Sequence, residues 1–357
     1  MRMSDILRGG QWEEERFPKK KPLFPVEEKP LAPPPVPKEP PPLQMRPKEP
    51  EAPPKIPAQA LYNDLLEFVK TRLFIDAETP REVTGADIQS TIEPLLDRVA
   101  DEAGELIYLA VTRSTPEYYL HAHAVNVAIL SLRLGVALGY TREELLTLGV
   151  GALLHDIGMI RVMDIAQKKE PLTPEERKKI TQHPQYSVDI LKETKDLTTV
   201  SLEIIGSVHE RYNGTGYPQG VGGSQLSEQA QVVAITDVYE ALTHSRSYRD
   251  KLLPYEALKE ILKTKELFHP KVLKTFIQYI TVYPIGCWVQ LSTGEIGQVV
   301  AVSADLPLRP TLKILYDNQM RALKPEKLLN LTQHSTLYIK RVLDEKELQQ
   351  KKEKGLF

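Results

Sequence analysis

Residues 150–156 read Val-Gly-Ala-Leu-Leu-His-Asp, an apolar run that ends in a histidine and a carboxylate. A run of this kind predicts a buried helix, with His155 and Asp156 at its inner end. Burying a carboxylate without a partner is costly, and an ion pair or a metal normally offsets that cost. The stretch therefore predicts a helical core with a polar site inside it.

Further histidines and acids lie on both sides of this stretch, and Asp237 likewise follows an apolar helical segment. In chain order the set is His123, His155, Asp156, His183, His209 and Asp237. A single histidine beside an apolar run is usually a core residue or a helix-end cation, and we interpret His121, His244, His269 and His334 in that way. The six together favour a divalent metal held by mixed nitrogen and oxygen ligands on separate helices.

Helical periodicity extends from residue 61 to about residue 280. Thr141, Thr173 and Ser227 each precede acidic residues and predict helix starts. One glycine-dense loop, residues 213–223, interrupts the pattern. After residue 284, three runs rich in β-branched and aromatic residues predict a small antiparallel sheet of roughly four or five strands.

The N-terminal stretch has a different composition, because residues 1–57 contain 16 of the 29 prolines. Proline fixes φ and lacks an amide donor, so we expect an extended, disordered tail. The predicted fold is mainly α, an all-helical domain followed by a small antiparallel β extension. The expected parts are a Pro-rich tail at 1–57, a helical N-terminal segment at 58–117, the metal-dependent helical domain at 118–282, the β extension at 283–345 and a charged tail at 346–357.

Composition excludes several classes of protein. The net charge of −2 gives no general basic field, so we expect no nucleic-acid polymer as a partner. A single cysteine, Cys287, fits a reducing compartment. The first residues do not resemble a signal peptide, and Arg133 interrupts the most apolar stretch, residues 124–139, which is shorter than the roughly 20 residues of a membrane span. These features predict a cytoplasmic protein without a membrane span.

Residues 118–269 resemble the HD-GYP family, a branch of the HD metal-dependent phosphohydrolases. The segments that carry the resemblance are His-Ala-Val-Asn at 123–126, His-Asp-Ile-Gly at 155–158, Gln-His-Pro at 182–184, His-Glu-Arg-Tyr-Asn-Gly-Thr-Gly-Tyr-Pro at 209–218, Thr-Asp-Val-Tyr-Glu-Ala-Leu at 236–242 and Ser-Arg-Ser-Tyr-Arg at 245–249. The resemblance implies a cyclic di-GMP phosphodiesterase that produces linear pGpG, and it leaves further cleavage to GMP open.

The resemblance also implies a role for each matching residue. His155 and Asp156 form the catalytic pair. The first metal is held by His123, His155, Asp156 and Asp237, and Asp156 bridges to a second metal at His183 and His209. The metals implied are iron or manganese, one bound tightly and one more weakly. The residues that it implies for substrate contact are Arg246, Arg249, Tyr217 and Gly216. It also implies that the loop with Tyr217 docks a diguanylate cyclase (GGDEF) partner. Homodimer formation stays open.

Three positions depart from the family pattern. Val208 replaces a histidine expected beside His209, Met159 replaces a lysine expected near phosphate, and Tyr119 replaces a glutamate that members with a third metal carry. Two alternatives to the enzyme therefore stay open. One is a catalytically impaired module that binds a cyclic dinucleotide or a GGDEF partner. The other is an HD phosphohydrolase with a different nucleotide substrate.

Overall fold

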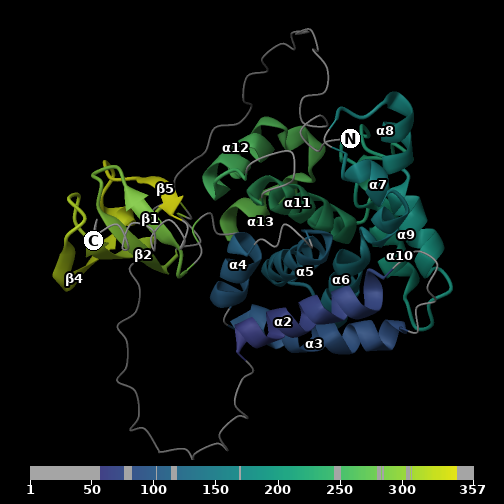
Figure 1. Ribbon diagram of the computed structural model, residues 1–357, viewed down its shortest axis with the longest axis horizontal. Coiled ribbons are helices and arrows are strands. Elements are labelled where there is room, and N and C mark those ends of the chain that lie inside the picture. The colour runs from purple at the N-terminus through teal and green to yellow at the C-terminus, as the bar shows by residue number, and fades with distance from the viewer. Residues whose placement is uncertain are drawn as a thin grey trace, which may run out of the picture.

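The structure is a computed structural model, and it describes residues 57–75, 83–101, 103–113, 119–168, 170–244, 251–279, 283, 285–302, 306 and 308–343. Helices occupy the chain up to residue 279 and strands follow from residue 288, as Figure 1 shows. This order confirms the predicted fold class, a mainly helical protein with a small C-terminal sheet. The predicted tails at 1–57 and 346–357 lie outside the described residues, apart from Pro57.

The helical part contains α-helices of very different length together with short 3-10 and π turns. In chain order they are α2 (Ala58–Phe68), η1 (Val69–Leu73), α3 (Gly85–Asp101), α4 (Ala103–Thr112), α5 (Tyr119–Leu138), α6 (Arg142–Leu154), η3 (Ile157–Arg161), α7 (Met163–Ala166), α8 (Pro174–Ile180), α9 (His183–Leu191), α10 (Thr199–Ser207), η4 (Gly223–Gln225), α11 (Glu228–Thr243), α12 (Pro254–Lys263), η5 (Lys265–Leu267) and α13 (Pro270–Tyr279).

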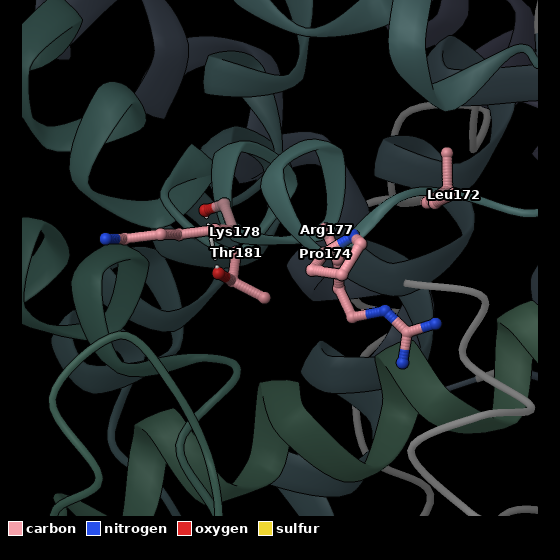
Figure 2. Close-up of a pocket in the computed structure, with 5 residues that line it drawn as sticks. All are labelled: Leu172, Pro174, Arg177, Lys178 and Thr181. Carbon is pink, nitrogen blue, oxygen red and sulfur yellow. Dashed lines mark hydrogen bonds between the residues drawn. The ribbon is translucent and has the colours of Figure 1, made fainter.

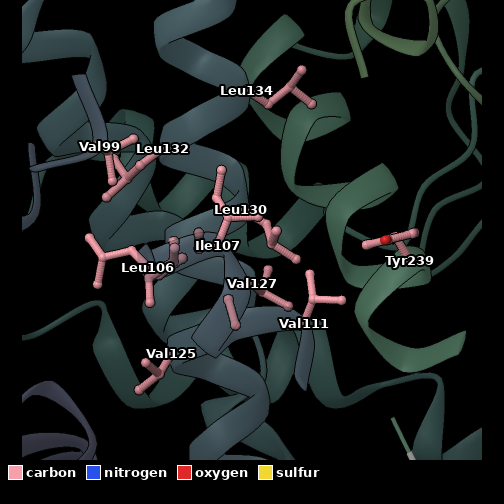
Figure 3. Packing of buried hydrophobic residues seen from close by; sticks show 14 of the residues in the cluster. Val99, Leu106, Ile107, Val111, Val125, Val127, Leu130, Leu132, Leu134 and Tyr239 are labelled. Atoms are coloured by element: carbon pink, nitrogen blue, oxygen red, sulfur yellow. The ribbon is translucent and has the colours of Figure 1, made fainter. Parts of the chain in front are cut away.

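Helix α5 is the centre of this part of the molecule. It packs against α3, α4, α6, α11 and α13. Figure 3 shows apolar side chains of α5, such as Leu132, beside those of neighbouring helices, such as Val99 on α3. Within the described parts of the chain, α5 alone is long and apolar enough to cross a membrane by length and composition. However, 78% of its most apolar 18-residue window is buried in the fold. Its hydropathy is therefore that of a core helix covered by other helices.

The helix starts follow from local side-chain chemistry. The Thr141 hydroxyl accepts a hydrogen bond from the Glu144 amide, and the Glu144 carboxylate accepts one from the Thr141 amide. Thr173 and Glu176 form the same reciprocal cap at α8, and the Ser227 hydroxyl caps α11. These contacts satisfy backbone donors that have no partner in the first turn of a helix, which is why the three predicted starts are confirmed.

The N-terminal helices α2, α3 and α4 belong to the same buried apolar cluster as α5 and α6. Tyr62 and Leu65 on α2, and Val69 at the start of η1, are almost wholly inaccessible to solvent. The predicted boundary at residue 118 therefore separates helices that share one core.

The β module is a five-stranded antiparallel sheet with the order β4-β3-β2-β1-β5. Its strands are β1 (Trp288–Leu291), β2 (Ile296–Ala301), β3 (Thr311–Tyr316), β4 (Ala322–Asn330) and β5 (Ile339–Leu343). Gly294 has a φ of 97°, which a glycine adopts without strain, and it turns the chain between β1 and β2. Cys287 and Val289 continue the apolar cluster of the helices, so the sheet packs on the helical core.

Candidate metal centre

The six residues predicted as metal ligands meet in one buried place. They come from five separate places along the helical fold, and none is more than 7% exposed. They are His123 on α5, His155 and Asp156 directly after α6, His183 at the start of α9, His209 after α10 and Asp237 on α11. Residues separated by more than 100 positions in the chain thus face one another.

The first group of ligand atoms belongs to His123, His155 and Asp237, and these atoms lie within 4.8 Å of one another. His123 Nε2 lies 3.2 Å from Asp237 Oδ1, and His155 Nε2 lies 4.0 Å from the same oxygen. Two imidazoles and one carboxylate at this spacing can converge on a single cation.

The second group belongs to Asp156, His183 and His209, whose ligand atoms also lie within 4.8 Å of one another. Asp156 Oδ1 is 3.0 Å from His183 Nε2 and 3.4 Å from His209 Nε2. The other oxygen of Asp156, Oδ2, is 3.6 Å from His123 Nε2 in the first group. Asp156 therefore faces both groups, which is the position a bridging ligand requires.

The protonation of two imidazoles shows that these groups suit a cation. His155 Nδ1 lies 2.8 Å from the main-chain oxygen of Ala152, and His183 Nδ1 lies 2.8 Å from that of Ile180. A carbonyl oxygen can only accept, so in the neutral imidazole Nδ1 carries the hydrogen and Nε2 carries a lone pair. Both Nε2 atoms are buried, make no hydrogen bond and face carboxylates. A metal ion would satisfy the lone pairs of the imidazoles and carboxylates together.

The electrostatics of the centre keep its ligands in metal-binding forms. Burial raises the pKa of Asp156, but the imidazoles of His155 and His183 outweigh it and hold that pKa well below its usual value. Burial likewise opposes ionisation of Asp237, but the neighbouring imidazoles of His123 and His209 outweigh it and lower the pKa of Asp237 overall. Burial, followed by repulsion from His183, lowers the pKa of His209 to about 4. Near neutral pH the acids are charged and His209 is neutral.

A close approach between η3 and α9 brings His183 to the centre. A Cβ atom on Gly158 would lie 2.2 Å from the main-chain oxygen of His183, so only glycine fits there. The Gly158 amide donates to the Ser187 hydroxyl, which lies 2.9 Å from the main-chain oxygen of His155. Ser187 thus ties the two ligand segments together. No local pattern in the sequence singles out this serine.

The glycine-dense loop folds back over the second group. Glu210 Oε1 accepts hydrogen bonds from the amides of Gln219 and Gly220 at 2.7 and 3.1 Å, which closes the loop. The Tyr217 ring stacks on His209, with ring centroids 5.0 Å apart and an interplanar angle of 14°. Burial raises the pKa of Tyr217, so its phenol stays protonated. The loop therefore presents an aromatic ring and a hydroxyl beside the candidate metal site.

Comparison with known proteins agrees with this geometry. Residues 106–272 match the family described as "HD domain", and residues 288–351 match the family described as "KOW domain associated with HD domain". Cyclic di-GMP phosphodiesterase PA4108 of Pseudomonas aeruginosa is 28% identical over 260 residues, which cover 72% of this chain and 63% of that protein. The helical domain is an HD domain, and it resembles the HD-GYP family.

Two further relatives are similar to this chain over shorter lengths. Cyclic di-GMP phosphodiesterase PdeB of Borreliella burgdorferi is 27% identical over 213 residues, covering 59% of this chain and 56% of that protein. The 3′3′-cGAMP-specific phosphodiesterase 2 of Vibrio cholerae is 29% identical over 189 residues, which cover 52% of this chain and 36% of that protein. The chain thus spans less than two thirds of the length of these relatives.

Two of the three departures from the HD-GYP pattern, Val208 and Met159, are apolar side chains packed in apolar clusters. Val208 is fully buried and belongs to the main helical core. Met159 packs in a second apolar cluster with Leu120 and Val162. Val208 offers no ligand atom to a metal, and Met159 offers no hydrogen-bond donor or charge to a phosphate. The predicted substrate residues Arg246 and Arg249 lie outside the described residues.

The histidines interpreted as structural belong to neither group of ligand atoms. His121, His269 and His334 lie apart from the grouped residues. His244 is buried, and its Nδ1 is 3.0 Å from the main-chain oxygen of Glu240. Glu240 is a functional candidate that the sequence interpretation missed. Its spacing of three residues from Asp237 places both on one face of α11, and that spacing was the available signal.

A separate hollow of about 560 Å³ lies at the surface around α8 and is lined by Leu172, Pro174, Arg177, Lys178 and Thr181. Figure 2 shows the side chains of Lys178 and Arg177 pointing in opposite directions. The two cations therefore do not converge on one anion. The hollow shares no residue with the metal centre.

Proposed function

We propose that this HD-GYP domain hydrolyses cyclic di-GMP, opening the ring at one 3′–5′ phosphodiester to give linear pGpG, with GMP as the product of a second cleavage. The observation that carries the proposal is the pair of three-residue ligand groups joined by Asp156. The names of the relatives support the same substrate class, because two of them are called cyclic di-GMP phosphodiesterases.

The centre is proposed to hold two divalent cations, iron or manganese, since its ligands are imidazoles and carboxylates. The first group, with Asp156, offers four residues, whereas the second offers three because Val208 supplies no ligand. We therefore expect one tight site and one weaker site. When bound, such ions stabilise the charge on the attacking and leaving oxygens of an in-line displacement.

The chain's own residues are assigned the remaining roles. His155 and Asp156 form the catalytic pair, since Asp156 faces both groups and His155 directs Nε2 toward Asp237. Tyr217 contacts substrate from the loop. Gly216 keeps that loop close, because a Cβ there would lie 2.4 Å from the backbone of Arg211. Arg246 and Arg249 are assigned to substrate phosphates, for which a guanidinium fork is well suited.

A second candidate function is a module that binds cyclic dinucleotide without turnover. The apolar packing of Val208 and Met159 favours it, because both positions lack the polar group that the family pattern supplies. The exposed loop residues Asn213, Thr215 and Gln219 would then serve as a docking surface for a diguanylate cyclase. Both functions act on a cytoplasmic second messenger, which supports a cytoplasmic location as part of the proposal.

The test uses purified full-length protein loaded anaerobically with Fe(II) or Mn(II). Hydrolysis of cyclic di-GMP and of 3′3′-cGAMP is followed by chromatography, and bound metal is measured in the same samples. We expect cyclic di-GMP to be cleaved faster. The double variant His155→Ala/Asp156→Ala should lose the first metal and at least about 100-fold in rate, more than loss of an outer partner costs.

The matched control is His334→Ala, which removes an exposed histidine of the β module and should change neither metal nor rate. Unchanged metal content in the double variant would refute the proposed ligand set. Tight cyclic di-GMP binding without turnover at full metal loading would instead establish the binding module. Faster cleavage of 3′3′-cGAMP would change the proposed substrate.

A further inference from the structure

A row of buried polar side chains leads from the metal centre to the first helix of the fold. His123 Nδ1 lies 2.5 Å from Glu240 Oε2, and the Asn126 amide donates to Glu240 Oε1 at 3.0 Å. The Tyr62 hydroxyl donates to Asn126 Oδ1 at 2.8 Å. None of the four residues is more than 2% exposed. The row crosses from α11 through α5 to α2.

The direction of each hydrogen bond follows from the chemistry of its groups. An ionised carboxylate can only accept, so His123 carries its hydrogen on Nδ1 and turns the lone pair of Nε2 toward Asp237 and Asp156. The amide nitrogen of Asn126 faces Glu240, which leaves its oxygen to accept from Tyr62. Each member therefore orients the next.

The hydrogen-bond partner of Nδ1 in His123 is of a different kind from the partners of Nδ1 in His155 and His183. His155 and His183 donate to main-chain oxygens three residues earlier in the chain. Their orientation is set by local backbone. His123 depends instead on a side chain of another helix, and Glu240 in turn depends on contacts with Asn126 and with His244, whose Nδ1 is 3.2 Å from Glu240 Oε1.

We propose that Glu240 is a positioning residue that sets the tautomer and orientation of His123, and that Asn126 and Tyr62 hold Glu240 in place. Helix α2, which lies outside the residues matched to the HD domain, thereby contributes to metal affinity. The inference rests on metal ligation by His123, a part of the proposed function. A carboxylate on the outer nitrogen of a ligand histidine raises its basicity, and loss of such a partner typically weakens metal affinity about 10-fold to 100-fold.

The test measures metal affinity of the full chain by competition with a chelator of known affinity, using Mn(II) alone. Thermal denaturation of each metal-free variant is recorded beside it. Glu240→Gln should weaken binding at the tighter site about 10-fold to 100-fold. Tyr62→Phe, which deletes one hydroxyl far from the metal, should weaken it about 3-fold to 10-fold, the effect of one lost hydrogen bond.

Two controls remove buried or half-buried hydrogen bonds that do not lead to a ligand. Ser131→Ala breaks the Ser131–Thr236 bond, which joins α5 and α11 as the row does. Tyr140→Phe deletes a tyrosine hydroxyl that donates to the carboxylate of Glu228. Both should lower the melting temperature of the metal-free protein and leave its metal affinity unchanged.

The inference would be overturned if folded Glu240→Gln bound Mn(II) as tightly as the wild type. It would also be overturned if the two control variants lost as much Mn(II) affinity as Glu240→Gln and Tyr62→Phe. Should Glu240→Gln fail to fold, Tyr62→Phe decides between the same outcomes. The hydrolysis assay tests the proposed function, and the affinity measurements test the role of the row. A wild-type protein that binds metal without cleaving any cyclic dinucleotide refutes the proposed function, while the affinity series still decides the role of the row.

Discussion

Val208 stands where the HD-GYP pattern has a histidine, and its side chain is fully buried in the helical core. Replacing it with histidine should raise occupancy of the second metal, because a further ligand is added beside His209. The larger imidazole must also be accommodated, and overpacking of a core typically costs about 1–3 kcal/mol of the free energy of unfolding. Metal content and thermal denaturation are measured on the same variant.

The control for added volume is Val208→Leu, which enlarges the side chain without supplying a ligand atom. It should lower stability and leave second-metal occupancy as in the wild type. Equal occupancy in the histidine and leucine variants would show that position 208 does not reach the second metal.

His209 should make the stability of the metal-free protein depend on pH. Its pKa is lowered to about 4 in the folded chain, against about 6.5 when unfolded. Between pH 4 and pH 6.5 the unfolded state binds more protons than the folded state. The contribution of neutral His209 to the free energy of unfolding is therefore complete above pH 6.5 and is lost as the pH falls toward 4. The effect amounts to at most about 3 kcal/mol. Urea denaturation after chelation measures it, and His209→Asn should flatten that part of the profile.

The loop between α10 and α11 makes a close backbone contact at Gly216. A Cβ on Gly216 would lie 2.4 Å from the Glu210 Cα atom and the Arg211 amide, so Gly216→Ala must displace the loop. Tyr217 would then leave the face of His209. We expect cyclic di-GMP affinity to fall at least about 10-fold, since a misplaced contact residue costs this much or more. Calorimetric titration of metal-loaded protein provides the measurement.

Gly206→Ala is the matched control for the loop. Its Cβ would meet only Val188, at 3.4 Å, and Gly206 lies in helix α10, where alanine is favoured. This variant should bind cyclic di-GMP as the wild type does and be slightly more stable. Unaltered affinity in Gly216→Ala would remove the loop from the substrate site.

At the scale of the whole chain, the N-terminal boundary of the folded part is testable. Ala58 and Leu61 are buried at the start of α2, so the helical core begins there. Deleting residues 1–56 should shift the melting temperature by no more than about 2 °C, less than about 1 kcal/mol in a chain of this size. A large loss of stability would show that the Pro-rich stretch packs on the core.

Deletion of residues 1–75 is the contrasting truncation, because it also removes α2 and η1. Tyr62, Leu65, Val69 and Leu73 would be lost from the core, and each is at most 1% exposed. A single large-to-small change in a core commonly costs about 2–5 kcal/mol. We therefore expect this truncated chain not to fold, and circular dichroism of any soluble product checks it.

Local chemistry determined much of this protein from sequence. The threonine and serine caps at residues 141, 173 and 227 start helices because their partners lie three residues away in the chain. The apolar run before His155 makes a buried helix for the same reason, since its periodicity is local. The identity of the six candidate ligands and the resemblance of residues 209–218 to the HD-GYP loop also depend on the order of residues alone.

Only the tertiary structure decided how these residues are grouped. Which histidine faces which oxygen of Asp156 depends on the packing of α5, α6, α9 and α11, and no sequence period encodes it. The contact of His123 with Glu240 spans 117 positions. The approach of Gly158 to the backbone of His183 likewise requires two helices to meet. Such contacts form because burial of the apolar helix faces brings distant segments together, and side-chain volumes then set their distances to within about 1 Å.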